Sequence, residues 1–361
     1  MNVPWAIPNI KDEDIRYVKQ VLDSGWYTMG KQVKKLEEDM SKYVGVKNAI
    51  ATNNGTTALE VMFRTVNIKP GDEIIVPAHS YIASATAVRL VGATPVFVDV
   101  DMYMNIDPES INDAITDKTK AVLAVDLTGN PCDYDKLENK CKENDIMLLV
   151  DGAQSLGSTY KNKSCIANGI MSTTSFHAAK VLTTVEGGMV FTNNNELAEI
   201  ARAIRTQGES GEKYVHKYLG GNYRMTDISA AFAIKQLERY NITLKERKAK
   251  VDYYKKLLGD VVAFVDARQE SISCNFIFPI LHYDCDGLAK FLNENGIGTR
   301  RIYPMTIPQQ PIFNVKKSYP LAEWFCQKTL SLPLYADLTF KQIEYVCDKV
   351  KEHVKKWKRR Y

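Results

Sequence analysis

The sequence predicts an α/β fold in which a mostly parallel sheet is covered by helices, followed by a smaller α+β unit. Four apolar runs of strand length occupy 73–77, 95–100, 121–126 and 146–151. Segments of helical pattern separate them, and strands that are apolar on both faces are typical of parallel sheets buried between helices. Beyond residue 258 this alternation stops and short strands and helices follow in mixed order, which predicts the second unit.

Length and composition indicate a globular protein of about two domains. The chain has 361 residues, of which 45% are hydrophobic and 25% charged. Lys and Arg number 47 against 43 Asp and Glu, and a net charge of +4 provides no electrostatic argument for nucleic-acid binding. The seven cysteines are scattered without a C-x-x-C pair, so reduced thiols are expected rather than a disulfide framework or a zinc site.

The sequence gives no sign of membrane attachment. The first residues lack a basic segment followed by an apolar run, and no apolar stretch approaches the roughly 18 residues of a membrane span. The tail at 349–361 is basic, and its apolar face predicts a packed helix with one solvated side. We therefore expect a cytoplasmic protein that binds neither membrane nor nucleic acid.

The N-terminal part should form two helices, at 12–23 and 31–44, and in the second the apolar residues recur at helical spacing. The loop at 24–30 between them carries two aromatic residues. It is either a connector whose rings pack on the core or a binding loop, and Thr28 is its candidate for substrate contact.

A third helix is expected within 51–66, where apolar residues recur at helical spacing. Thr57 and Glu60 have the spacing of a capping box, which places the start of the helix near Thr56 or Thr57. Gly55 would let a ligand approach the backbone, and the first amides of a helix bind phosphate well. A plain N-cap without a ligand explains the same residues.

Two strand ends carry polar groups that suit a ligand, because ligands gather beyond the carboxyl ends of parallel strands. Asp151 closes an apolar run, and a carboxylate there is unfavourable unless it is paired. Its partner could be the protonated pyridine nitrogen of a cofactor or neighbouring amides. Gln154 could bond the phenolic oxygen of such a cofactor or cap the turn, and Tyr81 could stack on its ring or simply pack.

The segment 172–188 holds the central candidate, Lys180, beside several hydroxyl side chains and before a glycine pair. This lysine is either a solvated cation or an amine nucleophile that forms a Schiff base with a carbonyl compound or with pyridoxal 5'-phosphate (PLP). The second interpretation requires a phosphate cup, a carboxylate for the pyridine nitrogen and an aromatic ring, and the chain has a candidate for each. No G-x-G-x-x-G follows a strand, which argues against a nicotinamide enzyme.

The remaining elements follow from the same patterns. Further helices are expected at 80–91, 108–116, 133–144 and 194–205, further strands at 171–176 and 188–192, and one long helix at about 226–258. The smaller unit should contain strands at 275–281 and 299–303 and helices at 284–295, 320–330 and 340–356. The long helix would link a large domain, 1–240, to a small domain, 241–361.

Six motifs, in order along nearly the whole chain, resemble the PLP-dependent sugar aminotransferases of the DegT/StrS type, which are fold type I enzymes. They are N-G-T-T-A at 54–58, P-A-H-S-Y-I-A at 77–83, D-G-A-Q at 151–154, S-F-H-A-A-K at 175–180, E-G-G at 186–188 and N-Y-R-M-T at 222–226. The resemblance implies PLP as the cofactor and a fold type I large domain with a seven-stranded sheet.

The resemblance also assigns a role to each matching residue. Lys180 would hold PLP covalently and act in catalysis together with Asp151, which would pair with the pyridine nitrogen. Gln154 would lie against the side of the ring, and Tyr81 would stack on it. The phosphate would be bound by a set of small polar residues: Gly55, Thr56, Thr57, Ser175 and, from the neighbouring subunit, Asn222. The active sites would thus be shared across a homodimer.

Three positions depart from the family pattern. Gly169 is followed by Ile170 where members often have aspartate, R-T-Q-G stands at 205–208 where R-x-H-G is common, and Ile302 replaces a histidine before Tyr303. None of them belongs to the cofactor set. The last two concern substrate contacts, for which Tyr303 is a further candidate.

The activity implied by the resemblance is transfer of an amino group from an amino acid, glutamate, to a nucleotide-linked keto-deoxysugar. Lys180 would move the proton between donor and cofactor as general base and acid. Three alternatives stay open: a PLP-dependent sugar dehydratase, which carries histidine in place of the lysine, a non-catalytic regulator on the same fold, and an aminotransferase that acts on amino acids alone. The sequence leaves the sugar, the nucleotide and the aminated carbon undecided.

Overall fold

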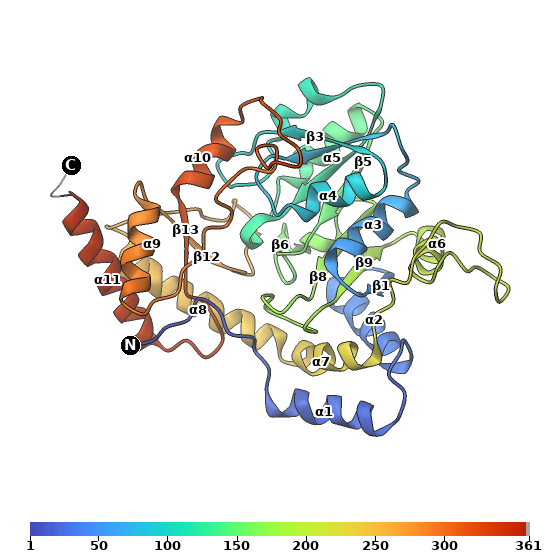
Figure 1. The fold of residues 1–361 in the computed structure, drawn as a ribbon, viewed down its shortest axis with the longest axis horizontal. Helices are drawn as coiled ribbons and strands as arrows, with labels where there is room; N and C mark the ends of the chain where they lie inside the picture. The colour runs from blue at the N-terminus through green and yellow to red at the C-terminus, as the bar shows by residue number, and fades with distance from the viewer. Residues whose placement is uncertain (359–361) are drawn as a thin grey trace.

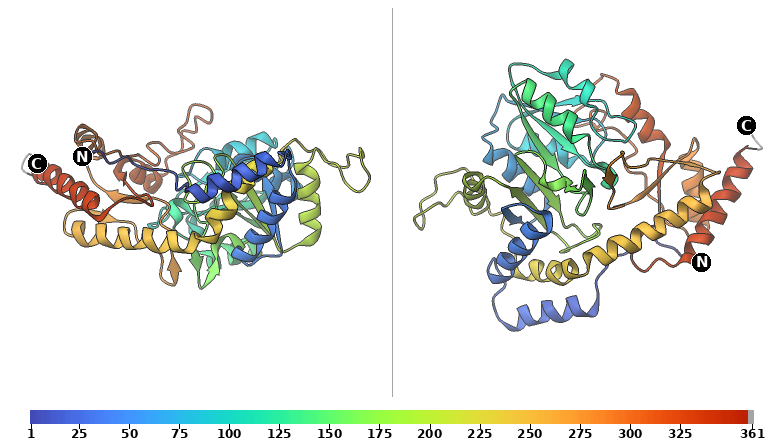
Figure 2. Two further views of the ribbon diagram at one scale, coloured as in Figure 1. Left: turned by 90° about the horizontal axis from the view of Figure 1, so that it is seen from below. Right: turned by 180° about the vertical axis from the view of Figure 1, so that it is seen from behind.

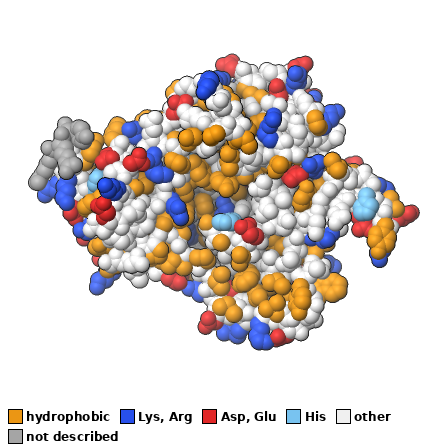
Figure 3. Space-filling model, in the orientation of Figure 1, with side chains coloured by type: hydrophobic (Ala, Val, Ile, Leu, Met, Phe, Trp, Pro, Cys, Tyr) orange, Lys and Arg blue, Asp and Glu red, His pale blue; other side chains and the backbone are white. Residues whose placement is uncertain are grey.

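The computed structural model describes residues 1–358, which form a larger part around a seven-stranded sheet and a smaller part beside it (Figure 1). The N-terminus lies in the smaller part, near the C-terminal helix, in all three ribbon views (Figures 1 and 2). One face of the molecule is hollowed near its middle (Figure 3). Within the described range, no helix combines the length and the apolar character needed to span a membrane.

The sheet of the larger part is mostly parallel, as the sequence predicts. Its order is β1-β9-β8-β5-β4-β2-β3, and β9 is the strand that runs antiparallel to both of its neighbours. The strands are β1 (Asn48–Thr52), β2 (Glu73–Pro77), β3 (Thr94–Val98), β4 (Thr119–Val125), β5 (Met147–Asp151), β8 (Met171–Ser175) and β9 (Gly188–Thr192). Because β8, β5, β4, β2 and β3 run the same way, their carboxyl ends meet at one edge of the sheet.

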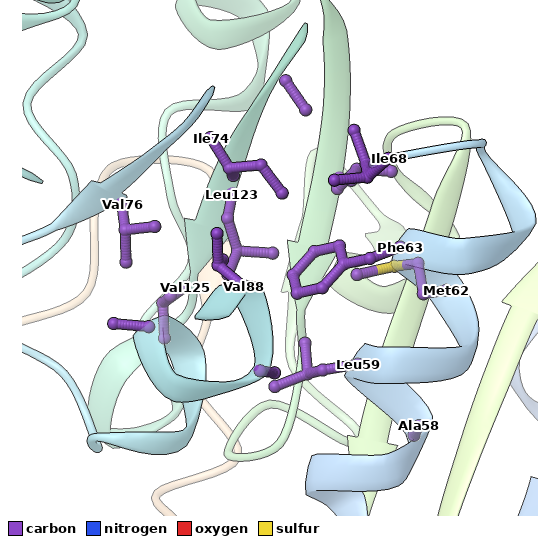
Figure 4. Close-up of a cluster of buried hydrophobic side chains, with 14 of the residues drawn as sticks. Ala58, Leu59, Met62, Phe63, Ile68, Ile74, Val76, Val88, Leu123 and Val125 are labelled. Carbon is purple, nitrogen blue, oxygen red and sulfur yellow. The ribbon is translucent and has the colours of Figure 1, made fainter. Parts of the chain in front are cut away.

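Helices α3 (Gly55–Thr65) and α4 (Ala83–Leu90) cover one face of this sheet, where their apolar side chains meet Leu123 of β4 (Figure 4). The preceding residue, Val122, belongs to the cluster on the opposite face, which includes α5 (Tyr134–Glu143). Both side chains are fully buried. Burial on two faces explains why β4 is apolar without alternation from Ala121 to Val125.

One strand of the sheet, β1, is absent from the sequence-based assignment. Its five residues, N-A-I-A-T, offer a short apolar run that ends in a polar turn. The strand exists because it pairs antiparallel with β9, from Asn48 opposite Thr192 to Thr52 opposite Gly188. This pairing joins residues about 140 positions apart, which local periodicity does not reveal.

The other helices of the larger part lie close to their predicted positions, with two exceptions. They are α1 (Asp12–Asp23), α2 (Lys31–Val44), α6 (Asn195–Arg205), α7 (Asp227–Glu238) and α8 (Tyr240–Leu258). The helix expected at 108–116 is instead two short 3-10 turns, Pro108–Ser110 and Asn112–Ala114. The single long helix expected at 226–258 is wrong as well, because Arg239 leaves the helical conformation and its guanidinium pairs with Asp14 of α1.

The smaller part is built on a three-stranded antiparallel sheet, β10-β12-β13. Its elements are β10 (Ala263–Phe264), β12 (Phe278–Leu281), α9 (Cys285–Glu294), α10 (Pro320–Lys328), β13 (Thr329–Leu332) and α11 (Phe340–Lys358). A further small sheet, β11-β6-β7, joins Ser271–Ile272 to Thr159–Tyr160 and Lys163–Ser164.

The strand expected at 299–303 does not form. Arg300 pairs with Ser331 as an isolated bridge, and the N–H of Tyr303 donates to the ring of His79 in the larger part instead of to a strand. Val3 lies in the buried cluster of the smaller part, so the N-terminal segment packs with residues beyond position 240. The division into domains at that position stays a prediction.

Candidate active site

The carboxyl ends of β4, β5 and β8 open into a cleft of about 650 Å³, which is closed on its other side by residues of the smaller part. Figure 3 shows a histidine and an acidic side chain beside the hollow on this face. Nine residues singled out by the sequence line the cleft: Gly55, Thr56, Thr57, Tyr81, Asp151, Gln154, Ser175, Lys180 and Tyr303. A cleft of this volume accommodates a small-molecule ligand.

Lys180 follows β8 and lines the cleft from a half-buried position. Its Nζ atom lies 4.5 Å from the centroid of the Phe276 ring. Loss of solvation lowers the pKa of Lys180 from 10.5 to about 8, although the negative charge of Asp151 acts in the opposite direction. About a tenth of this amine is therefore neutral at pH 7, and the neutral form is the nucleophile.

Asp151 ends β5, and only 4% of it is exposed. Its Oδ2 accepts a hydrogen bond of 2.8 Å from the Ser84 hydroxyl, and its Oδ1 accepts one of 3.1 Å from the Ala153 amide. Burial raises the pKa of Asp151, while these two hydrogen bonds and the charge of Lys180 favour the ionised form. A buried carboxylate held by two neutral donors still favours a cation as its next partner, and a protonated pyridine nitrogen is one.

Gln154 is held in one orientation by two contacts. Its Oε1 accepts a hydrogen bond of 2.8 Å from the Thr128 amide, and its Nε2 donates to the Tyr303 hydroxyl at 3.3 Å. Because a backbone amide only donates, the side-chain oxygen must face Thr128 and the side-chain nitrogen must face the cleft. The second N–H of that nitrogen can donate to an oxygen of a ligand.

Two tyrosine rings meet at the cleft, with the centroids of Tyr81 and Tyr303 5.5 Å apart. Tyr81 is 54% exposed, so a ligand can reach its ring. The N–H of Tyr303 donates a hydrogen bond of 3.1 Å to Nε2 of His79, which ties the smaller part to the end of β2. Burial lowers the pKa of His79 to about 4, so its ring stays neutral and can accept this bond.

The N-terminus of α3 faces the cleft beside the end of β8. Asn54 is the N-cap, and its Oδ1 accepts a hydrogen bond of 2.9 Å from the Thr57 amide while the Thr57 side chain completes the capping box. The predicted capping box of Thr57 with Glu60 is therefore wrong, and Glu60 forms an ion pair within the helix instead. A Cβ atom on Gly55 would lie 2.8 Å from Cβ of Ser175, so glycine permits the close approach of helix and strand.

The first amides of α3 and a hydroxyl of β8 together form a cup for an anion. The N–H groups of Gly55 and Thr56 precede the first hydrogen bond of the helix and have no partner within it. Oγ of Ser175 accepts a backbone N–H at 3.3 Å, which leaves its own proton to donate. The Thr57 hydroxyl already contacts Oδ1 of Asn53 at 2.6 Å. Helix amides and a hydroxyl in this arrangement suit a phosphate group.

Two residues predicted for the site lie outside this cleft. Thr28 is exposed in the loop between α1 and α2, where its carbonyl oxygen accepts a hydrogen bond of 3.3 Å from the Asp227 amide. Asn222 is also exposed, and it pairs with Thr206 as an isolated bridge. Neither side chain lines the cleft of its own chain.

Several residues that shape the cleft are missed by the sequence analysis. Ser80 lines it just before α4, and Ser84 supports Asp151 from the first turn of α4; two hydroxyl residues at 80 and 84, directly after a strand end, are a signal that could have found them. Trp5 and Phe276 also line it. They lie far apart in the sequence, so no local pattern connects them with the other residues.

These groups match the chemical requirements of PLP. The cleft contains an amine that can hold the aldehyde, a buried anion for the ring nitrogen, a helix N-terminus for the phosphate and an aromatic ring. In the part of the chain that the structure describes, no three His, Cys, Asp or Glu side chains are placed to hold a metal ion.

Comparison with known proteins leads to the same chemistry. Residues 8–351 match the model of the DegT/DnrJ/EryC1/StrS aminotransferase family. GDP-perosamine synthase of Caulobacter vibrioides is 35% identical over 353 residues, with 94% of this chain and 95% of that protein covered. A pleiotropic regulatory protein of Geobacillus stearothermophilus is 33% identical, with 98% of each chain covered. The crystal structure of S. venezuelae DesV in complex with a ketimine intermediate is 30% identical, with 98% of each chain covered and a TM-score of 0.93.

Proposed function

Since the chain belongs to the DegT/DnrJ/EryC1/StrS aminotransferase family, we propose that it transfers an amino group from an amino acid to a nucleotide-linked keto-deoxysugar. It is an aminotransferase, and its cofactor is PLP. The observation that carries the proposal is the presence, in one cleft, of a desolvated amine at Lys180 and a buried carboxylate at Asp151.

Removal of the amino group from the donor and its addition to the acceptor each require a proton transfer. The cleft contains an amine, Lys180, that can carry this proton. Bound PLP supplies a ring that takes up the electrons released when a proton leaves the α-carbon of the donor. Lys180 would hold the cofactor and would accept and return that proton at its Nζ atom. Asp151 keeps a proton at the ring nitrogen. The amides of Gly55 and Thr56 and the hydroxyl of Ser175 hold the phosphate.

Three more residues set the position of the ring. The free N–H of Gln154 Nε2 would donate to the phenolic oxygen, and Tyr81 would stack on the ring face. Thr57 would act through the helix, because its amide donates to the N-cap Asn54 and its hydroxyl accepts the Asn54 N–H, which would keep the first amides of α3 aimed at the phosphate.

The substrate class is supported by relatives whose names denote enzymes of nucleotide sugars, such as GDP-perosamine synthase. We expect glutamate as the amino donor. Burial raises the pKa of Tyr303, so its phenol stays protonated and can donate to a sugar oxygen in the cleft. Thr28 would contact a substrate in the cleft of a second subunit, since it lies outside its own.

We also propose a homodimer with shared active sites in the cytoplasm. Asn222 would complete the phosphate site of a neighbouring subunit. Large apolar side chains such as Trp26, Tyr214 and Leu219 are 58%, 75% and 79% exposed, as expected for residues that a second subunit covers. All seven cysteines are free and buried, which supports a reducing compartment.

Two alternative functions can be compared with the proposed one: a sugar dehydratase and a regulator without catalysis. A sugar dehydratase would carry histidine in place of Lys180, and the lysine therefore favours amino transfer. A regulator without catalysis is favoured by the likeness to the pleiotropic regulatory protein. Against it stands the full set of cofactor groups around Lys180 in the cleft.

Replacement of Lys180 tests the proposal directly. The purified protein should absorb near the visible edge after incubation with PLP, and borohydride should fix the cofactor on Lys180. Lys180→Ala should lose this absorbance and at least about 10³-fold of turnover with glutamate and a panel of nucleotide keto-sugars, because both the attachment and the proton carrier are gone. Lys180→Arg keeps the positive charge and should be equally inactive.

Each negative result has its own meaning. A wild-type protein that stays colourless with PLP would overturn the whole proposal. A coloured protein that transfers nothing to any sugar would favour the regulator, and transfer between two amino acids without a sugar would favour an amino-acid enzyme.

A further inference from the structure

The hydroxyl groups of Ser80 and Ser84 form a hydrogen-bonded chain that ends at Asp151, and neither serine is among the residues proposed to bind PLP. Oγ of Ser84 donates to Oδ2 of Asp151 at 2.8 Å, and Oγ of Ser80 lies 2.8 Å from Oγ of Ser84. The exposed fractions are 0% for Ser84, 3% for Ser80 and 4% for Asp151. The three side chains thus form a hydrogen-bonded line that is removed from water, and its outer member, Ser80, lines the cleft.

The direction of the hydrogen bonds in this line follows from the number of protons. An ionised carboxylate only accepts, so the single hydroxyl proton of Ser84 goes to Asp151. The Ser84 oxygen can then act toward Ser80 only as an acceptor, and Ser80 must donate. Both O–H dipoles point toward the carboxylate, and hydrogen bonds in such a series polarise one another.

The backbone around this line favours the same charge state. Ser84 lies in the first turn of α4, where the helix dipole favours negative charge nearby. The other carboxylate oxygen is bound by the Ala153 amide. Asp151 is therefore fixed at both oxygens, which leaves its remaining lone pairs for a partner in the cleft.

We propose that Ser84, polarised by Ser80, is a positioning residue that keeps the Asp151 carboxylate ionised and oriented toward the ring nitrogen of PLP. The inference rests on the role of Asp151 in the proposed function and adds two residues that act through it. The titratable groups that face Asp151 are Lys180, from the segment after β8, and Tyr303, from the smaller part. Neither replaces a hydrogen bond to the carboxylate, so removal of the Ser84 hydroxyl should let Asp151 take up a proton more readily.

Ser84→Ala in the complete chain tests this through cofactor binding. We expect the Kd for PLP to rise about 10- to 100-fold, because a hydrogen bond to a buried charge is lost. The pH profile of the bound cofactor's absorbance should shift as well, since the ring nitrogen holds its proton less firmly. Ser84→Thr keeps the hydroxyl and should stay within about threefold of the wild type.

A matched control lies on the same helix. Thr86→Ala removes a hydroxyl that donates to the carbonyl of Ile82 and not to Asp151, so its Kd and absorbance should be unchanged. Ser80→Ala should weaken PLP binding in the same sense but only about threefold, because it removes polarisation and not the direct bond. In an Asp151→Asn background, Ser84→Ala should add less than about twofold, since the charged acceptor is gone.

Three results would overturn the inference. The first is a Kd and a pH profile of Ser84→Ala equal to those of Thr86→Ala. The second is weak PLP binding by Ser84→Thr, and the third is an effect of Ser84→Ala in the Asp151→Asn background as large as in the wild type. If Ser84→Ala does not fold, Ser84→Cys supplies a weaker donor of similar size, and a Kd equal to the wild type would count against the role. Binding of PLP alone involves no sugar, so failure here leaves the proposed substrate class intact, whereas a colourless wild-type protein would overturn both.

Discussion

At the residue scale, burial in the cleft shifts the pKa values of a lysine and an aspartate, Lys180 and Asp151. Loss of solvation lowers the pKa of Lys180 and raises the pKa of Asp151, so it favours the neutral form of each. The hydrogen bonds from Ser84 and Ala153 act against this on the carboxylate alone. The result is an amine that can lose its proton near neutral pH beside an acid that is supported as an anion.

The pKa of Lys180 predicts the pH dependence of cofactor capture. Only the neutral amine attacks the aldehyde, so the rate of PLP capture should rise about tenfold per pH unit below pH 8 and level off above it. Stopped-flow absorbance measures this rate. The control is Nα-acetyl-lysine, whose side-chain amine has an ordinary pKa of about 10.4, so its rate should keep rising toward pH 10. A protein rate that follows the control through pH 9 and 10 would contradict the lowered pKa.

At the scale of elements, the site exists because strands and one helix deliver their ends to the same edge of the sheet. β5 ends in Asp151, β8 ends in Ser175 just before Lys180, and α3 begins with Gly55 beside them. The sequence predicts six of the seven strands, and five of these carry an apolar pattern of their own; the sixth, β8, reads M-S-T-T-S and is mostly polar. The strand expected at 299–303 does not form, and its last residue bonds to His79 of the larger part, a contact that the local sequence does not reveal.

The close approach of α3 to β8 makes a prediction about Gly55. In Gly55→Ala the new Cβ would lie 2.8 Å from Cβ of Ser175, so the helix must move away from the strand. We expect a loss of about 1–3 kcal/mol of unfolding free energy, as for other overpacked sites, and weaker PLP binding because the phosphate cup opens. Chemical denaturation and an absorbance titration measure the two effects.

Gly259→Ala is the control for this substitution. Gly259 follows α8 in a right-handed conformation, and a Cβ there would have a single neighbour at 3.1 Å, the carbonyl oxygen of Lys255. It should change stability by less than about 1 kcal/mol and leave PLP binding as in the wild type. If Gly55→Ala has the same stability and PLP affinity as Gly259→Ala, α3 tolerates the methyl group beside β8 and the prediction is wrong.

At the scale of the whole molecule, the cleft depends on parts of the chain that lie far apart in sequence. Trp5 from the N-terminal segment and Phe276 and Tyr303 from the smaller part line it together with the strand ends. Asn222 lies outside the cleft of its own chain, so a role in cofactor binding would require a second subunit.

Mixing of two inactive variants tests whether the site is shared. Lys180→Ala and Asn222→Ala should each lose most activity alone. In a mixed dimer one site carries both substitutions and the other carries neither, so refolded equimolar mixtures should regain about a quarter of wild-type activity if subunits pair at random. Analytical ultracentrifugation confirms the dimer in each sample. No regain in a sample shown to contain mixed dimers would mean that Asn222 serves its own chain or none.

The sequence by itself determined the fold class and most of the elements, and its motifs singled out Lys180 and Asp151 as candidates to hold the cofactor. Apolar periodicity and the order of short motifs are properties of the sequence, so they can be recognised without a structure. Only the tertiary structure decided the pairing of β1, the break at Arg239, the orientation of Gln154 and the support of Asp151 by Ser84. These depend on which distant groups meet in space, where hydrogen bonds and ion pairs override the preferences of a short segment.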